Sequence, residues 1–169
     1  MKTLLLILMS IGLFVSGTAQ ARDVKANASF SGTEHPTMID TNGDMIYAST
    51  GLFEVQGAHG RTVTHSFTEF TDFMWYGEPG CDVRALLVLQ DFVEIHKDGS
   101  MVFFRATDGY ACVDLTTGDV NGASSGIVID GTGKYEGASG TWEMTFKPYT
   151  LPSGLNAITG SITGTIELP

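Results

Sequence analysis

The chain has 169 residues and a formal net charge of −10, from 9 basic and 19 acidic side chains. This excess of carboxylates excludes nucleic acids and anionic membrane surfaces as partners, because proteins bind both through Lys and Arg. The 21 glycines, well above an average share of roughly 7 %, indicate a turn-rich β protein with the length of one ordinary domain.

Residues 1–21 are predicted to be a secretory signal peptide. Lys2 gives a positive start, an apolar run follows over 4–15, and Ala19-Gln20-Ala21 supplies small residues at the cleavage spacing. The apolar run is too short for a membrane span, which needs about 18 to 20 residues. We therefore expect cleavage after Ala21, a secreted or periplasmic protein, no membrane insertion, and a single domain over 22–169.

Export also determines how the two cysteines are interpreted. In an oxidising compartment Cys81 and Cys112 most simply form one disulfide, which would contribute roughly 3 to 4 kcal/mol to stability. Two free thiols are the open alternative.

The sequence gives little support for a metal site, and no metal or cofactor is expected. The stretch Asp40-Thr41-Asn42-Gly43-Asp44 resembles the start of a calcium loop, but Met45 and Gly51 stand where such a loop has Gly and Glu. An acidic surface turn is therefore preferred. The histidines are scattered without ligand spacing: His35, His59, His65 and His96.

Period-two alternation, rather than a helical apolar stripe, recurs after residue 44. It is clearest over 158–168, where Ile and Gly share one face while Thr, Ser and Glu share the other. Asp98-Gly99 and Asp108-Gly109 each separate two such runs and are expected to be turns. The expected strands cover 45–55, 61–70, 84–95, 101–107, 110–115, 126–130, 141–149 and 158–168.

Seven or eight short strands predict an all-β antiparallel barrel or sandwich. The Gly and Ile alternation over 158–168 favours an antiparallel barrel of about eight strands, because small inward residues leave room for large ones or for a ligand. The polar faces of these strands exclude an outer-membrane barrel, which needs an apolar outer band.

Three charged residues fall on strand faces that otherwise carry apolar side chains: Glu69, Arg84 and Arg105. A lone buried charge costs several kcal/mol, so inside a barrel these groups must pair or serve a ligand. They are the candidate catalytic residues. The alternative is that these faces turn outward near the strand ends and that the charges are solvated.

Three aromatic residues are the candidate ligand-binding residues: Trp75, Tyr76 and Tyr110. Such side chains offer a flat apolar wall, with a hydroxyl at one edge in the tyrosines, and suit the mouth of a barrel. They fit equally well as plugs of the core.

The segment Ile127–Gly140, with the sequence IVIDGTGKYEGASG, resembles a turn of the allene oxide cyclase/dirigent superfamily. A looser resemblance extends over 100–169 and includes the glycines of 57–60. It implies a calycin-like antiparallel barrel of eight strands with a mostly apolar cavity. Some relatives cyclise unsaturated small molecules and others steer the coupling of phenoxy radicals. Related barrels often assemble, so a homo-oligomer is expected by analogy.

These observations support three hypotheses about function. The first is a secreted barrel that binds a small apolar molecule in its interior, since no catalytic motif is present. The second is a cyclase-like isomerase that acts by orientation, with Glu69 and Arg84 or Arg105 holding the polar end of an unsaturated substrate. The third is an envelope or interaction protein with a filled barrel.

Overall fold

The computed structural model describes residues 22–57, 60–153 and 156–169. The predicted signal peptide over 1–21, its cleavage point after Ala21, and His59 lie outside these residues. Within the described ranges, no helix is long and apolar enough to cross a membrane.

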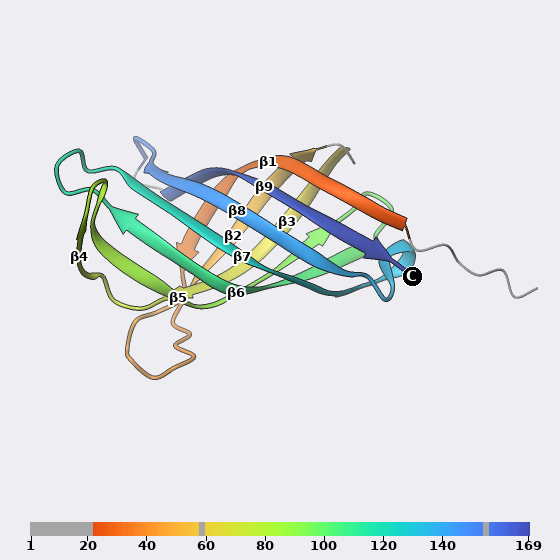
Figure 1. Ribbon diagram of the computed structural model, residues 1–169, viewed down its shortest axis with the longest axis horizontal. Helices are drawn as coiled ribbons and strands as arrows, with labels where there is room; N and C mark the ends of the chain where they lie inside the picture. Colours follow the sequence, from red (N-terminus) through yellow and green to blue (C-terminus); the bar gives the residue numbers. More distant parts are fainter. Residues whose placement is uncertain (1–21, 58–59, 154–155) are drawn as a thin grey trace, which may run out of the picture.

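Strands dominate the described part of the chain (Figure 1). In chain order the elements are β1 (Arg22–Pro36), β2 (Ser49–Gly57), β3 (Gly60–Phe70), β4 (Met74–Glu78), β5 (Cys81–Ile95), β6 (Met101–Val113), β7 (Val120–Gly131), the 3₁₀ helix η1 (Gly133–Tyr135), β8 (Ser139–Thr150) and β9 (Asn156–Leu168).

The strands form one antiparallel sheet that closes on itself. Its order is β3-β2-β1-β9-β8-β7-β6-β5-β4, and β3 also pairs with β5. This last pairing joins the sheet into a barrel of eight strands, with β4 lying alongside β5. The predicted all-β antiparallel barrel is therefore confirmed. Figure 1 shows an elongated barrel with β4 at one end and η1 at the other, called the β4 end and the η1 end below.

Some expected elements differ from the structure. The turn expected at Asp108-Gly109 is wrong, because β6 continues through it to Val113. The register of β6 against β7 shifts between Ala106 and Asp108, so a bulge lies where the turn was expected. β1 and β4 were not expected, since β1 is rich in small polar residues and β4 has only five residues, all exposed.

The alternation over β9 builds the inner face of the barrel as expected. Ile158 and Ile166 are buried, and Gly160 lies between strands where the Phe30 ring needs space. A Cβ added at Gly160 would lie 2.4 Å from that ring and 2.2 Å from the backbone oxygen of Thr145. Small residues thus accommodate large ones across the interior.

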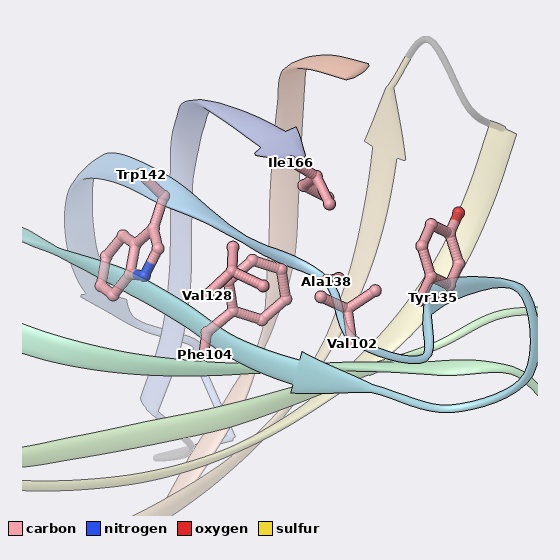
Figure 2. Packing of buried hydrophobic residues seen from close by; sticks show 7 residues of the cluster. All are labelled: Val102, Phe104, Val128, Tyr135, Ala138, Trp142 and Ile166. Atoms are coloured by element: carbon pink, nitrogen blue, oxygen red, sulfur yellow. The ribbon is translucent and has the colours of Figure 1, made fainter. Parts of the chain in front are cut away.

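The η1 end of the barrel is filled (Figure 2). The buried cluster consists of Val102, Phe104, Val128, Tyr135, Ala138, Trp142 and Ile166. The Trp142 indole Nε1 donates a hydrogen bond to the Ile127 oxygen at 3.1 Å, so its one polar atom is satisfied.

The glycine-rich motif after β7 brings Tyr135 into this cluster. Asp130 Oδ1 accepts hydrogen bonds from the backbone nitrogens of Gly131 at 2.7 Å and Gly137 at 3.0 Å, which lowers the pKa of its carboxyl. Gly133 and Gly137 have φ of 61° and 76°, which suits glycine. The motif is therefore a structural turn that closes one end of the barrel.

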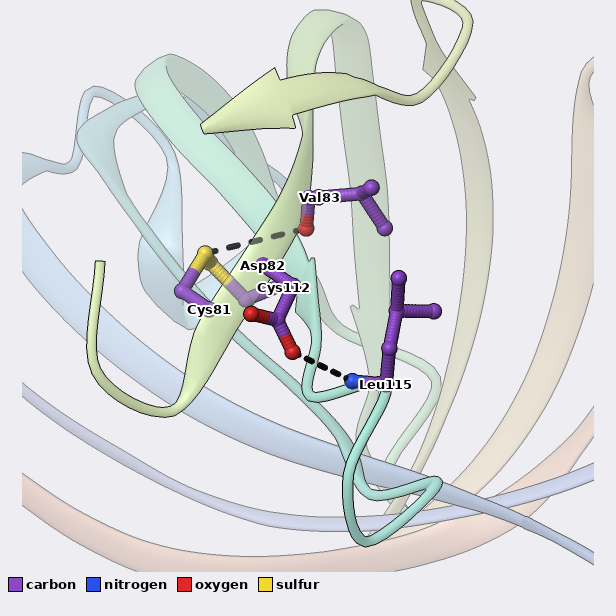
Figure 3. The surroundings of a disulfide bond; sticks show 5 residues. All are labelled: Cys81, Asp82, Val83, Cys112 and Leu115. Atoms are coloured by element: carbon purple, nitrogen blue, oxygen red, sulfur yellow. Dashed lines mark hydrogen bonds between the residues drawn. A yellow bond between two sulfur atoms is a disulfide. The ribbon is translucent and has the colours of Figure 1, made fainter. Parts of the chain in front are cut away.

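The disulfide between Cys81 and Cys112 is formed, with 5.1 Å between the Cα atoms (Figure 3). It joins the start of β5 to the end of β6. Asp82 Oδ2 reinforces this corner by accepting a hydrogen bond from the Leu115 nitrogen at 2.7 Å. Such a bond belongs to an oxidising compartment and supports an exported protein, whereas cleavage after Ala21 stays a prediction.

The substitution Gly160→Ala tests the packing of rings over glycines. Its Cβ would push against Phe30 and the β8 backbone, so we expect the free energy of unfolding in urea to fall by about 1–3 kcal/mol. Thr159→Ala is the control, because this neighbouring side chain is exposed. A Gly160→Ala protein as stable as the control would contradict this account of the interior.

Candidate functional site

A cavity of about 200 Å³ lies inside the barrel toward the β4 end. Its wall is mostly apolar and contains six phenylalanines, namely Phe30, Phe53, Phe70, Phe73, Phe92 and Phe146. Glycines admit three of these rings, because a Cβ at Gly51, Gly122 or Gly160 would overlap the rings of Phe53, Phe146 and Phe30. The apolar cavity that the resemblance implies is therefore present.

A second, smaller space of about 40 Å³ adjoins the cavity on its η1 side. Both spaces are bordered by Val55, Glu94 and Ile162. Beyond the smaller space the buried cluster around Trp142 and Tyr135 fills the barrel. The larger cavity is thus the part of the interior with room for a ligand.

One wall of the cavity is polar. The inward residues of β3 that border it are Thr64, Ser66 and Thr68, all at most 7 % exposed. Gln90 on β5 donates to Thr68 Oγ1 at 3.3 Å and accepts a hydrogen bond from Ser124 Oγ at 2.8 Å. Within the described residues, the buried Ser66 hydroxyl is without a hydrogen-bond partner.

Two carboxylates also border the cavity, Glu34 on β1 and Glu94 on β5. Burial raises the pKa of the Glu34 carboxyl above its ordinary value, and a hydrogen bond with the Ser49 side chain offsets part of this effect. Glu94 Oε1 accepts a hydrogen bond from Thr62 Oγ1 at 2.6 Å and lies 3.7 Å from Nε2 of His96.

These carboxylates were missed by the sequence analysis. Glu94 follows Phe92 by two residues on an alternating strand, so the criterion that selected Glu69 would have selected it too. Glu34 gave no such signal, because the strand that carries it was not expected.

Glu69 is buried, at 1 % exposure, but it does not border the cavity. Thr68 points inward, so the alternation of β3 places Glu69 on the outer face, beneath the segment 37–48. Its carboxylate accepts hydrogen bonds from the Thr41 nitrogen at 3.1 and 3.2 Å and from the Thr41 hydroxyl. Here Glu69 anchors a loop. Its catalytic role stays a prediction, and its carboxylate does not border the cavity.

The two arginines lie away from the cavity as well. Arg105 makes two hydrogen bonds to Asp91, both at 2.8 Å, and the pair is about half exposed. This is the solvated arrangement that the sequence left open as the alternative. Arg84 lies between the rings of Tyr76 and Tyr110, at 4.9 and 4.4 Å from their centroids. The structure thus brings Arg84, Tyr76 and Tyr110 together, but these three predicted site residues do not border the cavity.

The aromatic candidates do not line the cavity either. Trp75 and Tyr76 belong to the exposed strand β4, where Trp75 is 73 % exposed, and Tyr110 stacks on Arg84. A bulge in β6 precedes Tyr110, and the inward position beside it is taken by Ala111. Their role in ligand binding stays a prediction.

The acidic segment Asp40–Asp44 forms a tight loop against Glu69. Carboxylate oxygens of Asp40, Asp44 and Glu69 lie within 4.8 Å of one another. Those of Asp40 accept hydrogen bonds from the nitrogens of Gly43 at 2.6 Å and Met45 at 2.9 Å. The loop is therefore held by its own N–H groups.

Comparisons with known proteins give similarity of shape alone. No family model matches the chain, and no curated protein matches it. Among solved structures, the pterocarpan synthase dirigent protein GePTS1 matches at 9 % identity and a TM-score of 0.47, covering 89 % of this chain and 87 % of that one. The pterocarpan synthase dirigent protein PsPTS1 matches at 7 % identity and a TM-score of 0.41, covering 89 % and 97 %. These values leave family membership undecided.

Replacing Glu69 tests its role as a loop anchor. Glu69→Ala leaves the Thr41 amide and hydroxyl without their acceptor, so we expect faster hydrogen exchange at Thr41 and a stability loss of about 1–3 kcal/mol. Binding of an apolar probe inside the barrel should not change. Unaltered exchange at Thr41, or lost probe binding by a folded variant, would contradict this role.

Proposed function

We propose that the protein binds a small, largely apolar molecule inside its barrel. The observation that carries this proposal is the cavity of about 200 Å³ walled by six phenylalanines. An engineered cavity of about 150 Å³ is large enough to bind benzene, so this one suits a compound of about one or two rings.

The energetics of packing support a functional role for the space. Cavities in protein cores cost about 24 cal/mol per Å³, so 200 Å³ left empty costs about 5 kcal/mol. That is comparable with the whole stability of a small domain, about 5–15 kcal/mol. The same sequence packs the η1 end and leaves a space of only about 40 Å³ there, and the unfilled β4 end therefore favours a binding site over a filled scaffold.

Glu94 and His96 favour a second candidate function, an isomerase or cyclase-like enzyme. Both border the interior, and a carboxylate beside an imidazole can move protons on a bound molecule. Orientation inside an apolar cavity can supply roughly 7–11 kcal/mol of rate enhancement. Recovery of the bound compound unchanged separates a binding protein from an enzyme, which would release an isomer.

A pair of substitutions on adjacent residues of β3 tests the proposed site. Thr64→Phe adds a ring inside the cavity, whereas Val63→Phe adds the same ring on the outer face, where Val63 is 44 % exposed. We expect Thr64→Phe to weaken binding of neutral 1-naphthylmethanol at least tenfold by calorimetry, and Val63→Phe to leave it within about twofold.

Folding of both variants is checked by circular dichroism. Ala111→Leu, which adds bulk to the cavity from β6, replaces Thr64→Phe if that variant misfolds. The proposal would be refuted if Thr64→Phe bound 1-naphthylmethanol as tightly as Val63→Phe does. It would also be refuted if the unaltered protein did not bind this compound.

A further inference from the structure

We propose that the molecule bound in the barrel is an organic amine, held by an ion pair between its ammonium group and Glu34 while its apolar body lies among the phenylalanines. This inference rests on the proposed function and adds the chemical class of the ligand. It comes from the charge and the hydrogen-bonding state of the cavity wall.

The charge of the wall has one sign. Glu34 and Glu94 border the cavity, and neither it nor the adjoining space is bordered by a described Lys or Arg. Arg61 pairs elsewhere with Glu54 and Arg105 with Asp91, and Arg84 lies between two tyrosine rings. An anionic ligand would therefore face two carboxylates without a Lys or Arg to offset them, whereas a cation gains a partner.

Of the two carboxylates, Glu34 is the one that lacks strong partners. Glu94 already has the Thr62 hydroxyl at 2.6 Å and the His96 ring at 3.7 Å. Glu34 has the Ser49 side chain, and its burial outweighs that contact in raising its pKa. A half-buried carboxylate of this kind gains most from an ammonium group brought into the cavity.

The strand register places an aromatic group beside Glu34. Glu34 pairs with Gly51, and Gly51 pairs with Ser66, so the three residues lie in one row across β1, β2 and β3. Gly51 has no side chain of its own, and the Phe53 ring takes that space between Glu34 and Ser66. The Glu34 carboxylate is therefore the acceptor that an ammonium group in the cavity would meet, with the ring at its side.

An aromatic ring completes the head-group site. The Phe53 ring lies over Gly51, since a Cβ there would be 2.3 Å from Phe53 Cε2. A cation held at Glu34 would contact this ring, and such contacts are attractive inside a protein. Carboxylate and ring thus make a site that selects a cationic head.

Three ligands that differ only in the head group test this inference. These are 1-naphthylmethylamine, which is protonated at pH 7.5, the neutral 1-naphthylmethanol, and the anionic 1-naphthoate. We expect the amine to bind the unaltered protein at least tenfold more tightly than the alcohol, and the carboxylate to bind most weakly.

The variant Glu34→Gln should remove the advantage of the amine over the alcohol while leaving the affinity for the alcohol within about threefold. The matched control is Glu54→Gln, which removes one negative charge from the outer face of β2, where Glu54 pairs with Arg61. In this control the amine should still bind at least tenfold more tightly than the alcohol. Binding of the alcohol by Glu34→Gln also shows that the variant is folded.

The outcomes separate the two proposals. If the alcohol binds but the amine has no advantage, or if the advantage survives Glu34→Gln or is lost in Glu54→Gln, the amine assignment is overturned and the apolar site stands. If none of the three compounds binds, the proposed function fails together with it.

Discussion

The pairing of β3 with β5 determines the character of the interior, because it both closes the barrel and chooses which face of β3 points inward. The register sets Thr64 opposite Glu94 and Thr68 opposite Gln90, so two polar pairs flank the pair of Ser66 and Phe92 inside. A slip of one residue would bring Val63 and His65 inward and expose the hydroxyls. The polar wall of the cavity follows from this register.

Glycines opposite phenylalanines shape the remaining wall. The rings of Phe30, Phe53 and Phe146 occupy space that a Cβ at a neighbouring glycine would take. At the η1 end the same kind of interior is filled by Trp142 and Tyr135, the latter carried by the glycine-rich turn. The barrel therefore has a solid end that supports the fold and a hollow end that suits a ligand.

The sequence predicted the architecture better than the site. Alternation over β9 and the Asp98-Gly99 turn report local geometry, and both match the structure. The site depends on which face turns inward, and that is settled by bulges and long-range pairing. On β3 the alternation places Phe70 with Thr68 toward the cavity and leaves Glu69 on the outer face, while the bulge before Asp108 places Ala111 inside in place of Tyr110. Neither the inward face of β3 nor the bulge in β6 has a signature in the sequence alone.

The central claim is that the β4 end of the barrel holds an accessible apolar cavity. A crystal structure determined under xenon pressure tests it most directly, because xenon enters dry apolar cavities without needing a specific ligand. The account predicts an anomalous xenon peak among Phe53, Phe92 and Phe146, or density for a retained ligand in the same place. Side chains collapsed into this space, with neither xenon nor ligand among them, would contradict it.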